Sequence, residues 1–221
     1  VEIPKIAGKM VMDGKPSEED WQRAAVIKVS PTEAPEWQRF GTHCFTADYS
    51  LKKPTSDDDF SFEIFLLHDS QNLYVFAKVA DDILIINNFG DVHEADALEL
   101  FFDPDDKGTF TYRKYYCPVN FLSGINEELA QTPYTVIKRG RWEKGYTLEF
   151  NILFDDIRAG LAPVDGKRIG FDVQGIDIDD TNPMYELLFP MLRDKCFLTW
   201  SGGQDQNWLT AAFYGDAVFL P

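Results

Sequence analysis

The chain has 221 residues, of which 44% are hydrophobic and 14% aromatic, so it can fill a sizeable core and disorder is not expected. Its 37 acidic residues outnumber its 21 basic ones, which gives a formal net charge of -16. This field repels phosphate backbones and anionic lipid, and no run of about 18 apolar residues occurs, so we expect no nucleic-acid partner and no membrane insertion.

Helical patterns are scarce. The first lies at 17–24, where Ser17 can cap the helix and acidic residues occupy the first turn. Residues 30–59, which follow it, are rich in Pro, Ser and Asp, and we expect them to form a long loop. A shorter helical turn is predicted over 153–160.

Strand patterns dominate the remainder, because short stretches of alternating apolar and polar residues follow one another with turn residues between them. These stretches are 60–69, 72–81, 96–103, 111–119, 134–140, 145–152, 168–178, 196–200 and 216–220. About ten short strands joined by turns predict an all-β fold, an antiparallel β-sandwich of jelly-roll or immunoglobulin-like type with one or two short helices. We expect residues 1–221 to form a single domain.

Alternation also predicts which side chains share a face of a strand. Along 96–103, the apolar face is expected in the core and Glu99 lies on the other face. Along 168–178, Asp172 and Gln174 oppose the apolar face in the same way. A face of carboxylates and amides is either a solvated outer surface or a surface that binds sugar hydroxyls, since charged acceptors make strong hydrogen bonds.

The stretch WSGGQDQNW, residues 200–208, places a tryptophan at each end of a polar loop. Trp200 ends an apolar strand and is expected in the core. Trp208 is expected to face a ligand, with packing under the final strand as its alternative. An aromatic platform beside carboxylates and amides is the combination that binds a neutral sugar.

No motif supports catalysis. A glycosidase needs two carboxylates about 5–10 Å apart, and Glu94, Asp96 and Glu99 are candidates, although so acidic a chain satisfies that spacing by chance. The sequence has no nucleophile elbow, dinucleotide fingerprint or P-loop. We therefore predict no catalytic residue.

Three acidic clusters, at 57–59, 103–106 and 177–180, allow a structural calcium site, because calcium takes hard oxygen ligands. None of them matches an EF-hand loop. The cysteines Cys44, Cys117 and Cys196 have no zinc-finger spacing, so three buried thiols are favoured over one disulfide and a leftover thiol.

Six landmarks together resemble family 9 carbohydrate-binding modules in order and spacing, from about residue 10 to 220. They are MDGKPSEEDW, DSQNLYVFAKVADD, EADALELFFDPDD, GYTLEFNILFDDI, KRIGFDVQGIDIDD and FLTWSGGQDQNWLTAAFYGDAVFL. The resemblance implies a sugar-binding β-sandwich that binds mono- or oligosaccharides, often at the reducing ends of glycans. It also implies a protein that works beside, or is appended to, a glycoside hydrolase in polysaccharide breakdown, and one that is secreted, periplasmic or on the cell surface.

The resemblance implies five sugar-binding residues. Trp208 matches one wall of the family's tryptophan sandwich, Glu99 is the main hydroxyl acceptor, and Asn120 and Asp205 are secondary polar contacts. His93 stands where the family has the other tryptophan.

Two departures leave alternatives open. The loss of that tryptophan at His93, and of a family arginine at Pro118, is expected of a structural sandwich whose sugar site has decayed. A glycoside hydrolase with carboxylates near Glu99 is a second alternative, and a haem-binding sandwich is a remote third.

Overall fold

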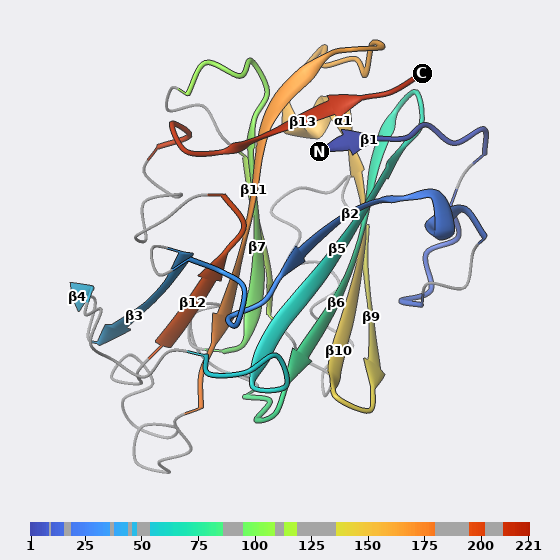
Figure 1. Cartoon of the computed structure of the whole chain (residues 1–221). Coiled ribbons are helices and arrows are strands. Elements are labelled where there is room, and N and C mark those ends of the chain that lie inside the picture. Colours follow the sequence, from blue (N-terminus) through green and yellow to red (C-terminus); the bar gives the residue numbers. More distant parts are fainter. Residues whose placement is uncertain are drawn as a thin grey trace.

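The computed structural model describes residues 1–8, 10–15, 19–35, 38–43, 46–47, 54–85, 95–108, 113–118, 136–179, 195–201 and 210–221. These residues form two β-sheets packed face to face, as Figure 1 shows. No helix in these ranges is long and apolar enough to cross a membrane.

The larger sheet has eight strands. Along its main path lie β1 (Glu2–Ile3), β13 (Gly215–Phe219), β11 (Arg168–Asp177), β12 (Lys195–Thr199), β3 (Arg39–His43) and β4 (Thr46–Ala47). Off this path, β7 (Ala97–Asp103) pairs with β11 and with β8 (Arg113–Pro118). All its pairings are antiparallel except that of β1 with β13.

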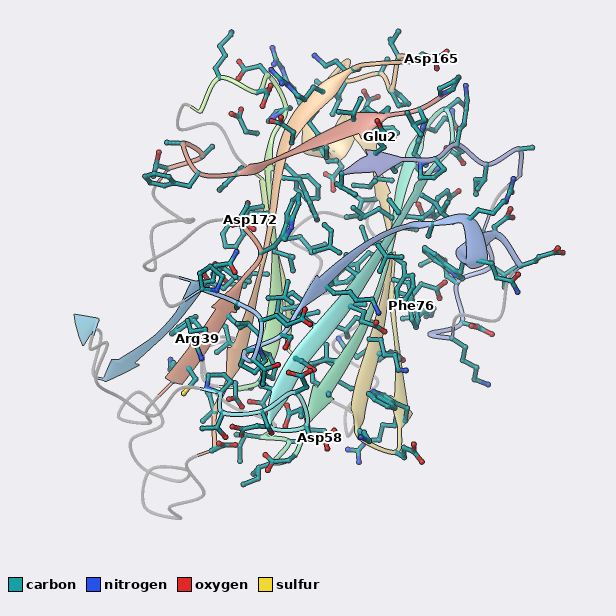
Figure 2. All side chains as sticks on the ribbon, viewed as in Figure 1. Glu2, Arg39, Asp58, Phe76, Asp165 and Asp172 are labelled. Carbon is teal, nitrogen blue, oxygen red and sulfur yellow. The ribbon has the colours of Figure 1, made fainter. Side chains whose placement is uncertain are left out.

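The smaller sheet has five antiparallel strands. Their order is β2 (Ala25–Val29), β5 (Phe60–His68), β6 (Asn72–Asp81), β10 (Gly145–Leu153) and β9 (Val136–Trp142). Side chains fill the space between the two sheets (Figure 2). The main core joins the inward faces of β5, β6 and β10 to those of β7 and β11, with fully buried Phe60, Val75, Phe150, Leu100 and Val173 among its members.

The predicted fold class is confirmed, and every predicted strand is present with ends that shift by at most two residues. The predicted helix at 17–24 is a 3-10 helix at Glu19–Arg23, and the turn at 153–160 contains α1 (Phe154–Ile157). The long-loop prediction was wrong for Arg39–His43, which forms β3 and pairs with β12. That stretch, RFGTH, has little apolar alternation, so its strand conformation is stabilised by pairing that the local sequence does not reveal.

The N-terminal segment covers part of the outward face of the five-stranded sheet. The backbone N–H groups of Asp13 and Gly14 both donate to Glu149 Oε2 at 2.8 Å, and Thr147 Oγ1 donates to the carbonyl of Gly14 at 2.7 Å. Further along that face, Trp21 packs against Phe76 with their ring centroids 5.7 Å apart. These contacts do not include Lys78, which lies on the same face.

Candidate functional site

Glu99 and Gln174 form a buried polar pair on the outward face of the eight-stranded sheet. They are directly opposite each other in the register of β7 and β11, and Gln174 Nε2 donates to Glu99 Oε2 at 3.2 Å. Each residue is only 2% exposed. Burial of a carboxylate is costly unless hydrogen bonds stabilise it, so an amide donor held at its oxygen is what such a position requires.

The surrounding face is also polar and buried. Asp172, which Figure 2 labels, is two residues before Gln174 on β11 and therefore lies on the same face of the strand. Its Oδ1 accepts hydrogen bonds from the backbone N–H groups of Val173 and Ser201 at 2.8 and 2.9 Å. Thr199, opposite Gln174 on β12, is fully buried. The alternative of a solvated outer face is therefore wrong for these residues.

Gln174 is the site residue that sequence reasoning did not select. Its Oε1 is buried and has no hydrogen-bond partner within the described ranges, so it can accept a hydrogen bond from a ligand hydroxyl. Alternation placed Gln174 on the polar face, but the pairing of β11 with β7 that brings it to Glu99 depends on register between distant strands.

Of the five predicted sugar-binding residues, only Glu99 can be placed. Trp208, His93, Asn120 and Asp205 lie outside the described residues. Pro118 ends β8, where its backbone pairs with Ala97.

Trp200 packs against the main core, as predicted. Its ring centroid lies 6.0 Å from that of Phe171, a buried core residue, and its backbone N–H donates to the carbonyl of Val173 at 3.0 Å. The first of the two tryptophans in residues 200–208 is therefore structural.

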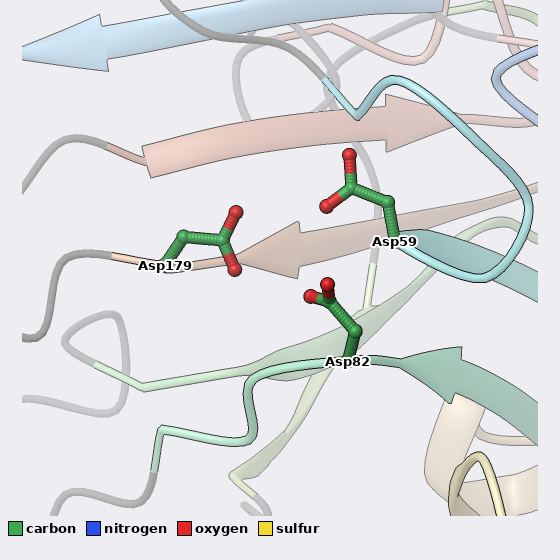
Figure 3. A group of neighbouring side chains, drawn as sticks. All are labelled: Asp59, Asp82 and Asp179. Carbon is green, nitrogen blue, oxygen red and sulfur yellow. The ribbon is translucent and has the colours of Figure 1, made fainter.

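A cluster of carboxylates lies at one end of the sandwich and joins both sheets. Asp59 precedes β5, Asp82 follows β6, and Asp179 follows β11. One carboxylate oxygen from each lies within 4.8 Å of the other two, and Figure 3 shows the three side chains pointing toward one another. Three converging hard oxygen ligands are a donor set that suits calcium, which prefers carboxylate and carbonyl oxygen.

Further carboxylates lie directly behind this cluster. Asp96, which is fully buried, accepts hydrogen bonds from the backbone N–H groups of Ile85 and of Ile178. Its pKa is raised well above the ordinary value by burial and by the neighbouring charge of Asp81. Burial likewise raises the pKa of Asp81 to about 7, and the charges of Asp179 and Asp82 act in the same direction. Asp81 Oδ2 is buried and has no hydrogen-bond partner in the described part of the chain.

The three acidic stretches of the sequence thus lie in different places in the structure. Those at 57–59 and 177–180 meet in this cluster, whereas 103–106 lies apart, where Asp106 pairs with Arg168 at 2.5 Å and Asp105 pairs with Lys107 at 3.1 Å. Among the cysteines, Cys196 is a buried thiol. Cys44 and the side chain of Cys117 lie outside the described part.

Comparisons with known proteins agree with this architecture. A family 9 carbohydrate-binding module from Caldicellulosiruptor kristjanssonii, solved with cellotriose, has 17% identity and a TM-score of 0.68, with 100% of this chain and 94% of that chain covered. The same organism's family 9 module, solved with glucose, has 16% identity and a TM-score of 0.66, with 99% and 95% covered. A putative carbohydrate-binding protein from Bacteroides uniformis has 13% identity and a TM-score of 0.58, with 99% and 98% covered.

At these identities the solved structures establish the fold, and no curated protein matches the sequence. The family is established by the sequence itself. The model of the carbohydrate family 9 binding domain-like family matches residues 29–220, which is most of the chain. The chain therefore belongs to the carbohydrate family 9 binding domain-like proteins.

Proposed function

We propose that this protein binds carbohydrate non-covalently, without catalysis, on the outward face of β7 and β11. The observation that carries the proposal is the buried Glu99–Gln174 pair, in which the Gln174 amide oxygen has no hydrogen-bond partner among the described residues and lies beside the carboxylate to which its amide nitrogen donates. A sugar presents several hydroxyls, each of which can donate one hydrogen bond and accept others. The family assignment supports the same conclusion, because this is a family of carbohydrate-binding domains.

The ligand class we propose is a mono- or oligosaccharide, bound at the end of a glycan. The solved family 9 modules that share the fold contain cellotriose and glucose, which makes glucose and its oligomers the first ligands to test. We retain Trp208 as the stacking platform, His93 as the opposite wall, and Asp205 and Asn120 as secondary polar contacts. The functional setting we propose is support of polysaccharide breakdown beside a glycoside hydrolase, by a protein that is secreted, periplasmic or on the cell surface.

Titration of tryptophan fluorescence with a panel of mono- and disaccharides tests this proposal. A saturable change in the wild type is expected, and Trp208→Ala should weaken binding several-fold through loss of about 1 kcal/mol of stacking. Unchanged affinity in Trp208→Ala would remove that residue from the site. A glycoside hydrolase would instead turn over a chromogenic glycoside and lose that turnover in Glu99→Gln.

We also propose that the carboxylate cluster of Asp59, Asp82 and Asp179 holds a structural calcium ion. Two observations support it: the three oxygens converge from both sheets, and Oδ2 of the adjacent Asp81 is buried with no hydrogen-bond donor among the residues that the structure describes. Like-charged carboxylates repel one another, so a cation among them removes an unfavourable electrostatic energy. An ion at this position would cross-link the ends of β5, β6 and β11.

A further inference from the structure

A pocket with charged and polar side chains in its lining lies on the outward face of the five-stranded sheet, away from the contacts of the N-terminal segment. Its volume is about 300 Å³, which is at the lower end of the range for small-ligand sites. Ser61 and Glu63 of β5 and Lys78 of β6 form its floor, since all three point away from the core. The turn after β2 and the indole of Trp142 form its walls.

Trp142 is fixed in place at this pocket. Its Nε1 donates to the carbonyl of Val79 at 2.8 Å, and the Lys78 ammonium lies 4.2 Å from the ring centroid. The residue opposite Trp142 in the neighbouring strand is Gly145, which has no side chain to fill the space above the sheet. An aromatic wall held by a hydrogen bond and a cation–π contact loses little conformational freedom when a ligand binds.

Two of the three carboxylates that line the pocket already have partners. Glu63 forms an ion pair with Lys28 at 2.6 Å, and Asp57 Oδ1 accepts hydrogen bonds from the hydroxyl groups of Ser30 and Thr32. Lys78, by contrast, forms no ion pair with any carboxylate in the described ranges, so its ammonium retains donors for a ligand. Donors and acceptors thus stand side by side on one small surface.

This chemistry selects a class of ligand. An apolar ligand would remove water from the charged groups of the floor without offering hydrogen bonds in its place. A polyanion is disfavoured, because the three carboxylates that line the pocket outnumber its two ammonium groups and the whole chain carries a net charge of -16. Vicinal hydroxyls meet the requirement, since one can accept from Lys78 while the next donates to Glu63, beside an indole ring.

We propose that this pocket is a second binding site for a neutral sugar, separate from the site at Glu99 and Gln174. The strands β7 and β6 belong to different sheets (Figure 1). Glu99 and Lys78 lie on the outward faces of these strands, so the main core lies between the two sites. Sugars bound at the two sites would lie on opposite faces of the sandwich.

The test is a heteronuclear NMR titration of the indole N–H signals with glucose, cellobiose and cellotriose, carried out in the Glu99→Gln variant so that the first site is weakened. We expect a saturable shift of the Trp142 signal, assigned with Trp142→Phe, and roughly tenfold weaker binding after Lys78→Ala. Lys15→Ala, which removes an exposed lysine outside the pocket, should leave the shift unchanged.

The outcomes separate this proposal from the proposed function. If the wild type binds one of these sugars but the Trp142 signal and the Ser61 and Lys78 amides do not move at saturation, the second site is wrong and the first stands. If the Trp142 signal moves equally in Lys78→Ala, the pocket is not the cause and the second site is again wrong. If none of the sugars moves any signal in the wild type, both proposals fail together.

Discussion

Glu99 of β7 and Gln174 of β11, 75 residues apart in the chain, face each other across two central strands with 3.2 Å between the amide nitrogen and the carboxylate oxygen. Both side chains are almost completely buried on a face that points away from the main core. If the pair served only to stabilise the sandwich, apolar residues of similar size at both positions would give equal or greater stability. This arrangement supports the proposal that a ligand contacts the pair.

Removing the amide should weaken sugar binding. Gln174→Ala deletes the amide that donates to Glu99, together with the Oε1 that has no partner in the described part of the chain. We expect a loss of about 1–3 kcal/mol of binding free energy, the usual cost of leaving a buried polar group without its partner. Isothermal titration calorimetry with cellotriose measures the binding affinity of this variant. Gln22→Ala, at an exposed glutamine, serves as the matched control. Equal affinities for the two variants would show that Gln174 does not contact the sugar.

Calcium should stabilise the fold. We expect the midpoint of thermal unfolding to rise on addition of calcium and to fall on chelation, since an ion bound only by the folded state adds to its stability. Asp82→Asn and Asp179→Asn should reduce this response, because each removes a charged ligand from the cluster.

Asp165→Asn, at an exposed aspartate remote from the cluster, provides the control for the loss of one negative charge (Figure 2). A calcium response of the same size in Asp82→Asn and Asp165→Asn would place the ion elsewhere or exclude it.

Without divalent cations, stability should decrease as pH rises from about 4 toward 7. The pKa of Asp81 is about 7 in the folded state against 3.8 for the unperturbed group, so the folded state binds more protons in this interval. The free energy of unfolding therefore falls with increasing pH, by at most about 1.4 kcal/mol for each unit of pKa difference. Asp96, whose pKa is also raised, contributes in the same direction.

Urea denaturation in the presence of a chelator, at pH values on either side of this interval, measures that slope. Asp81→Asn should flatten it, because the amide carries no titratable proton. A stability that is constant or that increases over the interval in the wild type would contradict the assignment.

The turn at Gly14 should tolerate no side chain. Gly14 has a φ of +79°, and a Cβ there would lie 2.7 Å from the carbonyl oxygen of Arg139. We expect Gly14→Ala to lower the free energy of unfolding by more than about 1 kcal/mol, since both the backbone and the contact would be strained. Gly8→Ala, where a Cβ would meet nothing within 4 Å, is the control measured by the same denaturation.

Much of the fold could be predicted because alternation is local. The alternation in 96–103 predicted both the strand and the outward position of Glu99. The apolar run that ends at Trp200 predicted that this tryptophan packs in the core. What could not be predicted depends on distant pairing. Gln174 becomes a candidate site residue only through the register of β11 with β7, which places it opposite Glu99. Asp59 lies near Asp179 only because strands of the two sheets have their ends close together there. The strand β3 could not be predicted for the same reason, since its partner β12 lies about 150 residues away in the chain.

The most direct test of sugar binding at the outward face of β7 and β11 is isothermal titration of the wild type, Glu99→Gln and Glu143→Gln with cellotriose. Glu143 is exposed and lies in the turn between β9 and β10 of the five-stranded sheet, so its substitution controls for the loss of one negative charge. We predict saturable binding by the wild type and by Glu143→Gln, with affinity at least about tenfold weaker for a folded Glu99→Gln. Equal affinity for all three proteins would contradict the central claim that the sugar lies on Glu99.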